Sequence, residues 1–335
     1  DKPAFSCLGH TLTFNDVDLM SRNFAAYLLN ETNLKQGDRI AIQLPNLSQY
    51  PIAAWGALRA GLILVNTNPL YTQRELIHQF NDAQIKALVV LESILPNVEA
   101  IVEQTSIEKV IVTNPIDLIQ AQPLPKTTLP AAITLLDALA IGESCSLPQL
   151  QQNMDDIAVL QYTGGTTGPS KGAMLTHRNM VANLEQSNAA TKNVYEVGKE
   201  IMVTALPLYH VYALTSNCLC FMPFGGKNLL ITNPRDMDGF VKELAKYPFT
   251  AITGVNTLFN ALLHTPGFDK LDFSALKLGF GGGMSVQRPV AELWEKVTKT
   301  RLLEGYGLTE CAPLVSMSPY NQENYDGTIG LPASS

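Results

Sequence analysis

The chain is organised by an alternation of strand-like and helix-like segments. Apolar runs typical of buried strands recur along its 335 residues, with amphipathic stretches typical of helices between them. The strand-like runs are residues 11–14, 39–44, 62–65, 87–91, 109–113, 157–160, 201–205, 228–231, 250–253, 276–280 and 301–303. The helix-like segments include residues 49–60, 73–81 and 176–187. Strands that alternate with helices pair in parallel, so we predict an α/β fold with doubly wound, mostly parallel sheets flanked by helices.

The alternation is interrupted between Asn114 and Asp155. Prolines at 115, 123, 125, 130 and 148 mark this stretch, which contains one short helix-like piece near 133–140. We therefore predict a first α/β subdomain at 1–113, a proline-rich connection at 114–155 and a second α/β subdomain at 156–335. Near the start of the chain, Asn15 or Asp16 is predicted to cap a helix.

Composition indicates a globular protein. Hydrophobic residues make up 46% of the chain and charged residues 16%, and the net charge is −7. That balance argues against a nucleic-acid binder. The five cysteines have no metal-site spacing and are expected to be reduced. We expect no signal peptide at the start of this sequence. Residues 201–226 carry no charged residue, but Pro207 and Pro223 interrupt them, so we predict a strand, a loop and a buried helix there; peripheral membrane contact stays open.

The glycine-rich stretch from Tyr162 to Gly172 is the strongest chemical signal. It places four glycines, four hydroxyl side chains and Lys171 between a predicted strand and a predicted helix. Glycine lets a backbone approach a ligand closely, and backbone N–H groups, hydroxyls and a lysine suit a polyphosphate. The alternative is an ordinary surface turn. The stretch is not a Walker A motif, which needs Gly-Lys-Ser/Thr directly before a helix, because Lys171 is preceded by Ser170 and followed by Gly172.

Further polar loops follow other predicted strands. They are residues 206–210, 254–256, 281–284 and 304–310. Ligands of open α/β sheets bind beyond the carboxyl ends of the strands, so we predict one shared site. Gly281–Gly283 offer either a flat surface for a planar base or a packing turn. Tyr306 offers a ring for stacking, and Thr309 and Glu310 offer the oxygen donors that Mg²⁺ prefers.

Three of these motifs together carry a family resemblance. The stretch from Tyr162 to Gly172, the run Glu304–Glu310 and the run Leu206–Tyr212 resemble the adenylate-forming enzymes: acyl-CoA synthetases, luciferases and peptide-synthetase adenylation domains. One departure is Gly165, where many members have serine. The resemblance implies the large N-terminal domain of that fold. It also implies that a substrate carboxylate attacks the α-phosphorus of ATP, which needs no Ser-His-Asp or Cys-His arrangement.

The resemblance assigns roles to individual residues. Lys171, His210 and Glu310 are the catalytic residues that it implies, and Thr163 and Glu310 are the Mg²⁺ ligands. The ATP or AMP site that it implies consists of Thr163, Gly164, Gly165, Thr166, Thr167, Gly168, Lys171, Gly281, Gly282, Gly283, Glu304, Gly305, Tyr306, Gly307, Leu308 and Thr309. The acyl site that it implies consists of His210, Val211, Tyr212, Leu214, Gly254 and Asn256. An aliphatic residue near Leu214 replaces the gating tryptophan of some relatives.

Longer segments resemble bacterial long-chain fatty acid–CoA ligases in particular. These are residues 43–46, 68–72, 160–185, 230–236 and 242–263. The resemblance implies ATP, Mg²⁺, a fatty acid and CoA as cofactor and substrates. It also implies a cytoplasmic protein, peripheral at the inner face of the membrane, and suggests a homodimer. Residues 201–226 and 255–259 are candidates to line an apolar acyl tunnel, or are ordinary core.

The resemblance also predicts what the chain lacks. Relatives continue beyond Gly327–Pro332 with a ribose-binding aspartate, a hinge and a small C-terminal domain that carries a catalytic lysine. We therefore expect a segment that binds ATP and is impaired in turnover. Two other functions stay open: an adenylating enzyme that loads a carrier protein, and a non-catalytic nucleotide- or lipid-binding module. The sequence does not predict the preferred length of the acyl chain.

Overall fold

The structure is a computed structural model that describes residues 1–129, 132–164, 168–321, 325 and 327–334. It divides into two compact units: Asp1 with Leu8–Arg178, and Lys2–Cys7 with Asn179–Ser335. The division differs from the predicted one. Residues 114–155 lie inside the first unit, and so does the strand that begins at Ile157, because that strand completes the first unit's sheet.

The first unit is built on a seven-stranded sheet in the order β7-β6-β5-β3-β4-β8-β9. Its strands are β3 (Arg39–Gln43), β4 (Ile63–Asn66), β5 (Ile85–Leu91), β6 (Lys109–Thr113), β7 (Ala132–Thr134), β8 (Ile157–Thr163) and β9 (Lys171–Thr176). Neighbouring strands are parallel up to β8, and β9 alone runs antiparallel to its partner. The predicted parallel sheet is confirmed, whereas the antiparallel strand β9 was missed.

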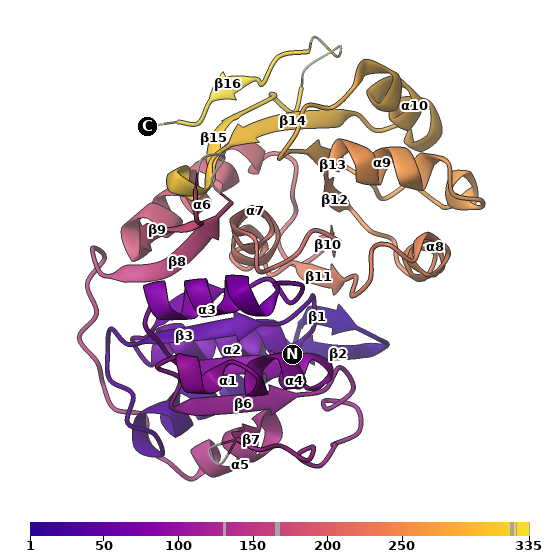
Figure 1. The fold of residues 1–335 in the computed structure, drawn as a ribbon. Coiled ribbons are helices and arrows are strands. Elements are labelled where there is room, and N and C mark those ends of the chain that lie inside the picture. Colours follow the sequence, from indigo (N-terminus) through magenta and orange to yellow (C-terminus); the bar gives the residue numbers. More distant parts are fainter. Residues whose placement is uncertain (130–131, 165–167, 322–324, 326, 335) are drawn as a thin grey trace. The chain divides into compact units, whose positions relative to one another are not determined.

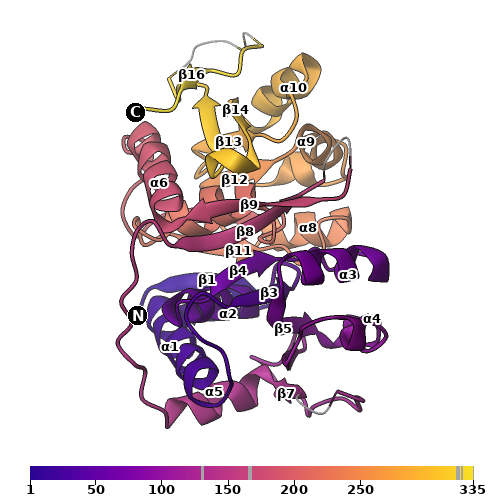
Figure 2. The same ribbon diagram turned by 60° about the vertical axis from the view of Figure 1, so that its left-hand side comes forward.

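Helices cover both faces of this sheet (Figures 1 and 2). They are α1 (Phe14–Asn30, after the short strand β2, His10–Thr13), α2 (Gln49–Arg59), α3 (Gln73–Asp82), α4 (Leu95–Glu99) and α5 (Leu135–Glu143). α1 packs on α2 and α5, while α3 and α4 pack on the opposite face through Leu76, Phe80 and Val98. The cap of α1 is Thr13 and not Asn15 or Asp16; Asp16 completes a capping box with it, because its carboxylate accepts from the Thr13 N–H at 2.8 Å.

The second unit contains a second, mostly parallel sheet. Within the unit its strands run in the order β16-β15-β14-β13-β12-β10-β11-β1. Their bounds are β1 (Pro3–Cys7), β10 (Ile201–Thr204), β11 (Lys227–Leu230), β12 (Ala251–Gly254), β13 (Leu278–Gly281), β14 (Leu302–Gly307), β15 (Leu314–Met317) and β16 (Leu331–Pro332). Only the pairs β14–β15 and β15–β16 are antiparallel among the pairs described in this unit. The strands predicted between 201 and 303 are therefore confirmed.

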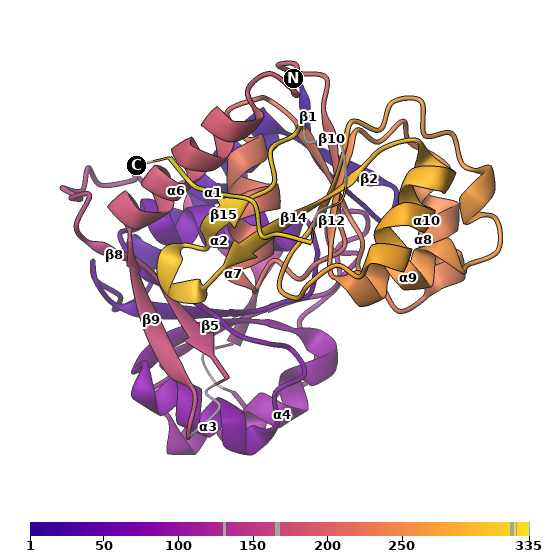
Figure 3. The same ribbon diagram turned by 90° about the horizontal axis from the view of Figure 1, so that it is seen from above.

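The helices of the second unit also lie on both sides of its sheet. They are α6 (His177–Thr191, all but its first two residues in this unit), α7 (Val211–Ala213) with a π-helical continuation (Leu214–Leu219), α8 (Met237–Leu244), α9 (Asn256–Leu263) and α10 (Arg288–Thr298). Figure 3 shows α8, α9 and α10 together on one side of the strands, with α6 and α7 on the other. Trp294 centres the core on the first side, with its ring 5.0 Å from that of Phe259 and 5.7 Å from that of Phe268.

The uncharged segment 201–226 folds as predicted. It forms β10, a loop, α7 and the π-helical turn, and Leu214 and Cys218 within it are buried. In the part of the chain that the structure describes, no helix combines the length and the apolar character needed to cross a membrane.

Candidate functional site

The glycine-rich stretch lies between the paired antiparallel strands β8 and β9 of the first unit. β8 ends at Thr163 and β9 begins at Lys171, and these two residues are cross-strand partners. Lys171 is exposed and Thr163 is partly exposed. A Cβ added at Gly164 or Gly168 would meet nothing within 4 Å. The hairpin therefore presents a lysine and bare backbone to solvent, as a phosphate loop requires. The candidate residues Gly165, Thr166 and Thr167 lie outside the described residues.

The base of the hairpin is fixed by side chains of its own unit. The Tyr162 ring lies beneath Gly172, where an added Cβ would come within 3.0 Å of it. The Tyr162 hydroxyl donates to the Asp82 carboxylate of α3, and burial, together with this bond to a carboxylate, raises the pKa of the phenol. His78 of the same helix contacts the Ser170 carbonyl through Nε2 at 2.8 Å. Both ends of the glycine-rich stretch are thus bonded to α3, through Tyr162 before it and Ser170 within its last residues.

In the second unit, the carboxyl ends of three neighbouring strands meet. Gly254 at the end of β12 pairs with Gly281 of β13, which pairs with Glu304 of β14. The Gly282 N–H donates to the Gly254 carbonyl at 3.1 Å. The structure therefore brings together three of the loops that the sequence predicted to share a site.

The glycines of these loops make room for protein side chains. A Cβ at Gly281 would lie 2.4 Å from Val286 Cγ2, and one at Gly282 would lie 2.9 Å from the Tyr212 ring. Gly305 is limited in the same way by the Phe280 ring at 2.4 Å. Gly283, which has a φ of +76°, is exposed and has only Val255 within 4 Å. Gly281 and Gly282 thus fit the packing alternative, and Gly283 is the member of the triplet that faces open space.

Two candidate ligand residues hold backbone instead of facing solvent. The buried Glu304 carboxylate accepts from the Val286 N–H at 2.7 Å, and the buried Asn256 Oδ1 accepts from the Gln287 N–H at 2.9 Å. These bonds fix the segment that follows Gly283 against the ends of β12 and β14. The Glu304 and Asn256 side chains therefore hold the backbone of these loops in place.

Glu310 lies on a tight turn between β14 and β15. The Cys311 N–H donates to the Leu308 carbonyl at 2.9 Å, and the Leu308 N–H donates to the Pro313 carbonyl at 3.0 Å. Backbone hydrogen bonds within the turn therefore hold its two ends together. Gly307 is required here, because a Cβ would lie 2.4 Å from the Pro313 oxygen. Glu310 is exposed, and Tyr306 and Leu308 expose 42% and 47% of their surface. The turn therefore presents a carboxylate and a ring outward from a fixed backbone.

Two buried side chains that the sequence analysis missed anchor the exit of this turn. The Thr215 hydroxyl donates to the Ala312 carbonyl at 3.0 Å. Asn183 of α6 makes two hydrogen bonds with the backbone of Leu314. Its Nδ2 donates to the Leu314 carbonyl at 2.8 Å, and its Oδ1 accepts from the Leu314 N–H at 2.9 Å. Both side chains come from elements far away in the sequence, so no local pattern could have predicted these contacts.

His210 caps α7 with its ring. Nδ1 accepts from the Tyr212 N–H at 3.2 Å, so the neutral ring carries its proton on Nε2. The residue retains an exposed side, yet desolvation by the surrounding chain lowers its pKa below the ordinary value. Tyr212 beneath it donates its hydroxyl to the Phe280 carbonyl at 3.1 Å. A neutral imidazole whose Nε2 carries the proton can donate to a carboxylate, as the predicted role requires.

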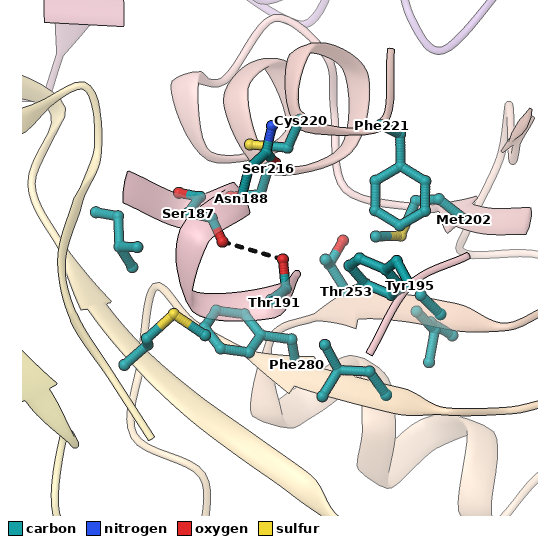
Figure 4. Close-up of a pocket in the computed structure, with 15 residues that line it drawn as sticks. Ser187, Asn188, Thr191, Tyr195, Met202, Ser216, Cys220, Phe221, Thr253 and Phe280 are labelled. Atoms are coloured by element: carbon teal, nitrogen blue, oxygen red, sulfur yellow. Dashed lines mark hydrogen bonds between the residues drawn. The ribbon is translucent and has the colours of Figure 1, made fainter. Parts of the chain in front are cut away.

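A pocket lies inside the second unit, between α6, the π-helical turn and the sheet (Figure 4). It encloses about 500 Å³ of empty space, its open mouth included. The lining residues, none of them charged, are Ser187, Asn188, Thr191, Tyr195, Met202, Ser216, Cys220, Phe221, Ala251, Ile252, Thr253, Leu278, Phe280, Leu314 and Met317. Figure 4 shows Ser187, Asn188, Ser216 and Cys220 at one side of it, away from Tyr195, Phe221 and Met202.

The predicted acyl residues and this pocket overlap only in part. Residues 201–226 contribute four lining residues, as expected for a tunnel wall. None of His210, Val211, Tyr212, Leu214, Gly254 and Asn256 lines the pocket, and neither does the stretch 255–259. Phe259 belongs to the core around Trp294, which is the alternative that the sequence left open. Helix α6 supplies Ser187, Asn188 and Thr191 to the wall, and these polar residues gave no signal of a pocket in the sequence.

The candidate site residues are therefore split between the two units. Thr163, Gly164, Gly168 and Lys171 lie in the first, and the remaining described candidates lie in the second. The meeting of Lys171 with Glu310 and Tyr306 in one crevice stays a prediction.

The donor set fits a magnesium–nucleotide complex. Among the described residues, no group of three or more His, Cys, Asp and Glu side chains is arranged to hold a metal. Glu310 and Thr309 instead offer isolated, accessible oxygens. Mg²⁺ takes one or two carboxylates and obtains its other ligands from substrate phosphates and water, so this sparse set suits it.

Comparison with known proteins identifies the class. The profile of the AMP-binding enzyme family matches residues 1–335, and the chain belongs to that family. The match includes the hairpin, the strand ends and the Glu310 turn described above, so the predicted membership and the predicted fold are confirmed.

Individual relatives are more specific. A long-chain-fatty-acid–CoA ligase of Escherichia coli O6:H1 is 54% identical over 349 residues, which cover 100% of this chain and 62% of the relative. The crystal structure of the anthranilate CoA ligase AuaEII with anthranoyl-AMP has a TM-score of 0.87 at 19% identity, covering 99% of this chain and 62% of that one. A long-chain-fatty-acid-CoA ligase from Archaeoglobus fulgidus has a TM-score of 0.85 at 23% identity, covering 99% and 66%. The chain spans less than two thirds of these relatives.

Proposed function

We propose that this chain is the ATP- and acid-binding part of a long-chain fatty acid–CoA ligase. The observation that carries the proposal is the 54% identity with such a ligase across the whole chain. The strand-end loops of the second unit, the exposed lysine hairpin of the first unit and the uncharged pocket support it. The substrates are then ATP, a long-chain fatty acid and CoA, with Mg²⁺ as the cofactor.

In the proposed reaction, an oxygen of the fatty acid carboxylate attacks the α-phosphorus of ATP. The bond to the bridging oxygen breaks, and pyrophosphate leaves with that electron pair. The CoA thiol then attacks the acyl carbon of the acyl-adenylate, loses its proton and displaces AMP. No nucleophile of the protein takes part, so the chain acts by positioning the reactants and stabilising charge.

Individual residues support these steps in defined ways. Lys171 is an exposed cation close in sequence to the bare backbone of Gly168 and would neutralise charge that develops on the phosphates. The Nε2–H of neutral His210 would orient the carboxylate, because its Nδ1 is engaged by the Tyr212 N–H. Thr163 and Glu310 would hold Mg²⁺, which when bound offsets negative charge on ATP.

The pocket would take the hydrocarbon chain. Burial of a CH₂ group is worth about 0.8 kcal/mol, so a long chain gains affinity from each carbon that enters an uncharged cavity. Small-molecule sites are lined mostly by apolar and aromatic side chains with a few polar groups, and the lining of this pocket has that character. Tyr195, Phe221 and Met202 at one side of the pocket would then limit the length of chain that it accepts.

Mass spectrometry of the products tests the proposal. The full-length protein would be incubated with ATP, Mg²⁺, CoA and an equimolar mixture of fatty acids from C6 to C18. We expect acyl-CoA enriched in the longer chains, with AMP formed in equal amount. Formation of ADP, or of no thioester with any acid, would contradict the proposal. A carrier protein with phosphopantetheine, tested in place of CoA, separates this function from carrier loading.

A cytoplasmic location, peripheral association with the inner face of the membrane and a homodimer are further parts of the proposal. Their support is the family resemblance alone. Sedimentation of the full-length protein with and without phospholipid vesicles measures both the oligomeric state and the association. A monomer that stays in the supernatant would remove these two parts and leave the ligase activity untouched.

A further inference from the structure

The turn that carries Glu310 is held at its exit by the two elements that wall the pocket. Leu314, two residues after Ala312, lines the pocket itself. Asn183 lies one helical turn before the lining residue Ser187 on α6, and Thr215 directly precedes the lining residue Ser216. The pocket and the turn are therefore joined by a short set of side-chain contacts, all inside the second unit.

The contact through α6 is continuous. The Ser187 hydroxyl, which lines the pocket, donates to the Asn183 carbonyl at 2.8 Å. The Asn183 side chain in turn makes both hydrogen bonds with the backbone of Leu314. Asn183 exposes only 3% of its surface, so these bonds are shielded from water and from competition with it.

The contact through the π-helical turn is a single buried bond. Thr215 and Ala312 expose 0% and 1% of their surface, and the Thr215 hydroxyl donates to the Ala312 carbonyl at 3.0 Å. Ala312 has a φ of +67°, in the left-handed region that a residue with a Cβ rarely adopts. Such a conformation persists only where its surroundings impose it. The Thr215 bond therefore helps to fix the backbone at Ala312, and with it the orientation of the turn that carries Glu310.

We propose that Thr215 and Asn183 are positioning residues that set the Glu310 turn relative to the pocket. They touch neither nucleotide nor metal. They act through Ala312 and Leu314, and they couple the seating of the acid in the pocket to the presentation of the Mg²⁺ ligand. The inference rests on the proposed function for the roles of Glu310 and the pocket.

The test is a Mg²⁺ titration of the full-length protein and of Thr215→Val, which keeps the shape of the side chain and removes the donor. We expect about a 10-fold lower kcat for adenylate formation and about a 5-fold higher half-saturating Mg²⁺ concentration, because small misplacements of catalytic groups are costly. Thr215→Ser restores the donor and should return both values to within about 2-fold of wild type.

A control separates positioning from general loss of stability. Thr298→Val also removes a buried threonine hydroxyl, one that donates to the Trp294 carbonyl at 2.9 Å in α10, away from the turn. It should lower the melting temperature and leave the Mg²⁺ dependence as it was. A Thr215→Val protein with wild-type kcat and Mg²⁺ dependence would overturn the inference. So would a Thr215→Ser protein as impaired as Thr215→Val.

A second variant covers a failure to fold. If Thr215→Val is not folded, Asn183→Asp removes the donor to the Leu314 carbonyl and keeps the acceptor, and the same Mg²⁺ shift is expected; its absence would also overturn the inference. If the wild-type protein forms no adenylate with any acid, the proposed function fails. The same titration, followed by calorimetric binding of ATP, then still decides whether Thr215 positions the turn.

Discussion

The Lys171 hairpin and the Glu310 turn serve one predicted ligand but are built in opposite ways. At the hairpin, Gly164 and Gly168 have empty space where a Cβ would be, and Lys171 extends into solvent. At the turn, Gly307 has a carbonyl oxygen 2.4 Å from that position, and buried side chains hold the backbone that follows. The comparison teaches that glycine leaves room for a ligand in the first case and for the protein itself in the second.

The largest expected effect is on catalysis at the hairpin. Lys171→Met should lower the rate of adenylate formation about 10²–10³-fold, because it removes a cation directed at the phosphates. Since the side chain is exposed, the melting temperature should stay within about 1 °C of wild type. Pyrophosphate release and thermal unfolding measure the two. A large loss of stability with little loss of rate would show that the hairpin lysine is structural.

The next effect is on folding at the turn. Gly307→Ala places a methyl group against the Pro313 oxygen and should lower the free energy of unfolding by about 1–3 kcal/mol. Urea denaturation followed by tryptophan fluorescence is the measurement, since Trp294 is fully buried in the same unit. An unchanged midpoint of urea denaturation would mean that the backbone of the turn shifts to accommodate the methyl group, and that the bonds from Thr215 and Asn183 do not fix the turn.

The matching substitution at the hairpin should leave folding almost unchanged. Gly168→Ala meets open space, so the free energy of unfolding should change by less than about 0.5 kcal/mol. The KM for ATP should rise, because the methyl group occupies the surface that the phosphates approach. Urea denaturation and initial rates at varied ATP concentration separate the two. A loss of stability equal to that of Gly307→Ala would remove the contrast between the regions.

The smallest effect concerns proton binding at His210. Burial lowers its pKa, so the folded protein binds the proton less readily than the unfolded chain. Its contribution to stability should be constant above pH of about 6.5 and fall as the pH drops below that value. An NMR titration of the imidazole, assigned with His210→Gln, measures the pKa directly. A midpoint at or above about 6.5 would contradict the neutral ring proposed for the carboxylate.

The sequence predicted the repeating parts of the fold well and its exceptions poorly. β3, α2 and β6 were placed within about two residues, because buried parallel strands and helices packed on them leave strong local patterns of apolar residues. β9 was missed, since its short run Lys171–Thr176 mixes polar and small residues and leads directly into α6. The boundary between the two units was predicted after residue 155, but it lies after Arg178. A proline-rich stretch marks a loose connection and not necessarily a boundary between units.

The site shows the same limit. Motifs placed the hairpin and the Glu310 turn, because glycines, hydroxyls and carboxylates gather there in the sequence. The anchors could not be found that way: Asn183 reaches Leu314 across 131 residues and Thr215 reaches Ala312 across 97. The roles of Glu304 and Asn256 could not be predicted either. A motif does not reveal whether a carboxylate or an amide binds a ligand or accepts a hydrogen bond from a backbone N–H.

The most direct test of the account is the exchange of labelled pyrophosphate into ATP by the full-length protein without CoA. Exchange reports the reversible formation of an acyl-adenylate and nothing later. We predict exchange that requires both Mg²⁺ and a long-chain fatty acid and that is lost in Lys171→Met. Absence of exchange with every carboxylic acid, in a folded protein that binds ATP, would contradict the account.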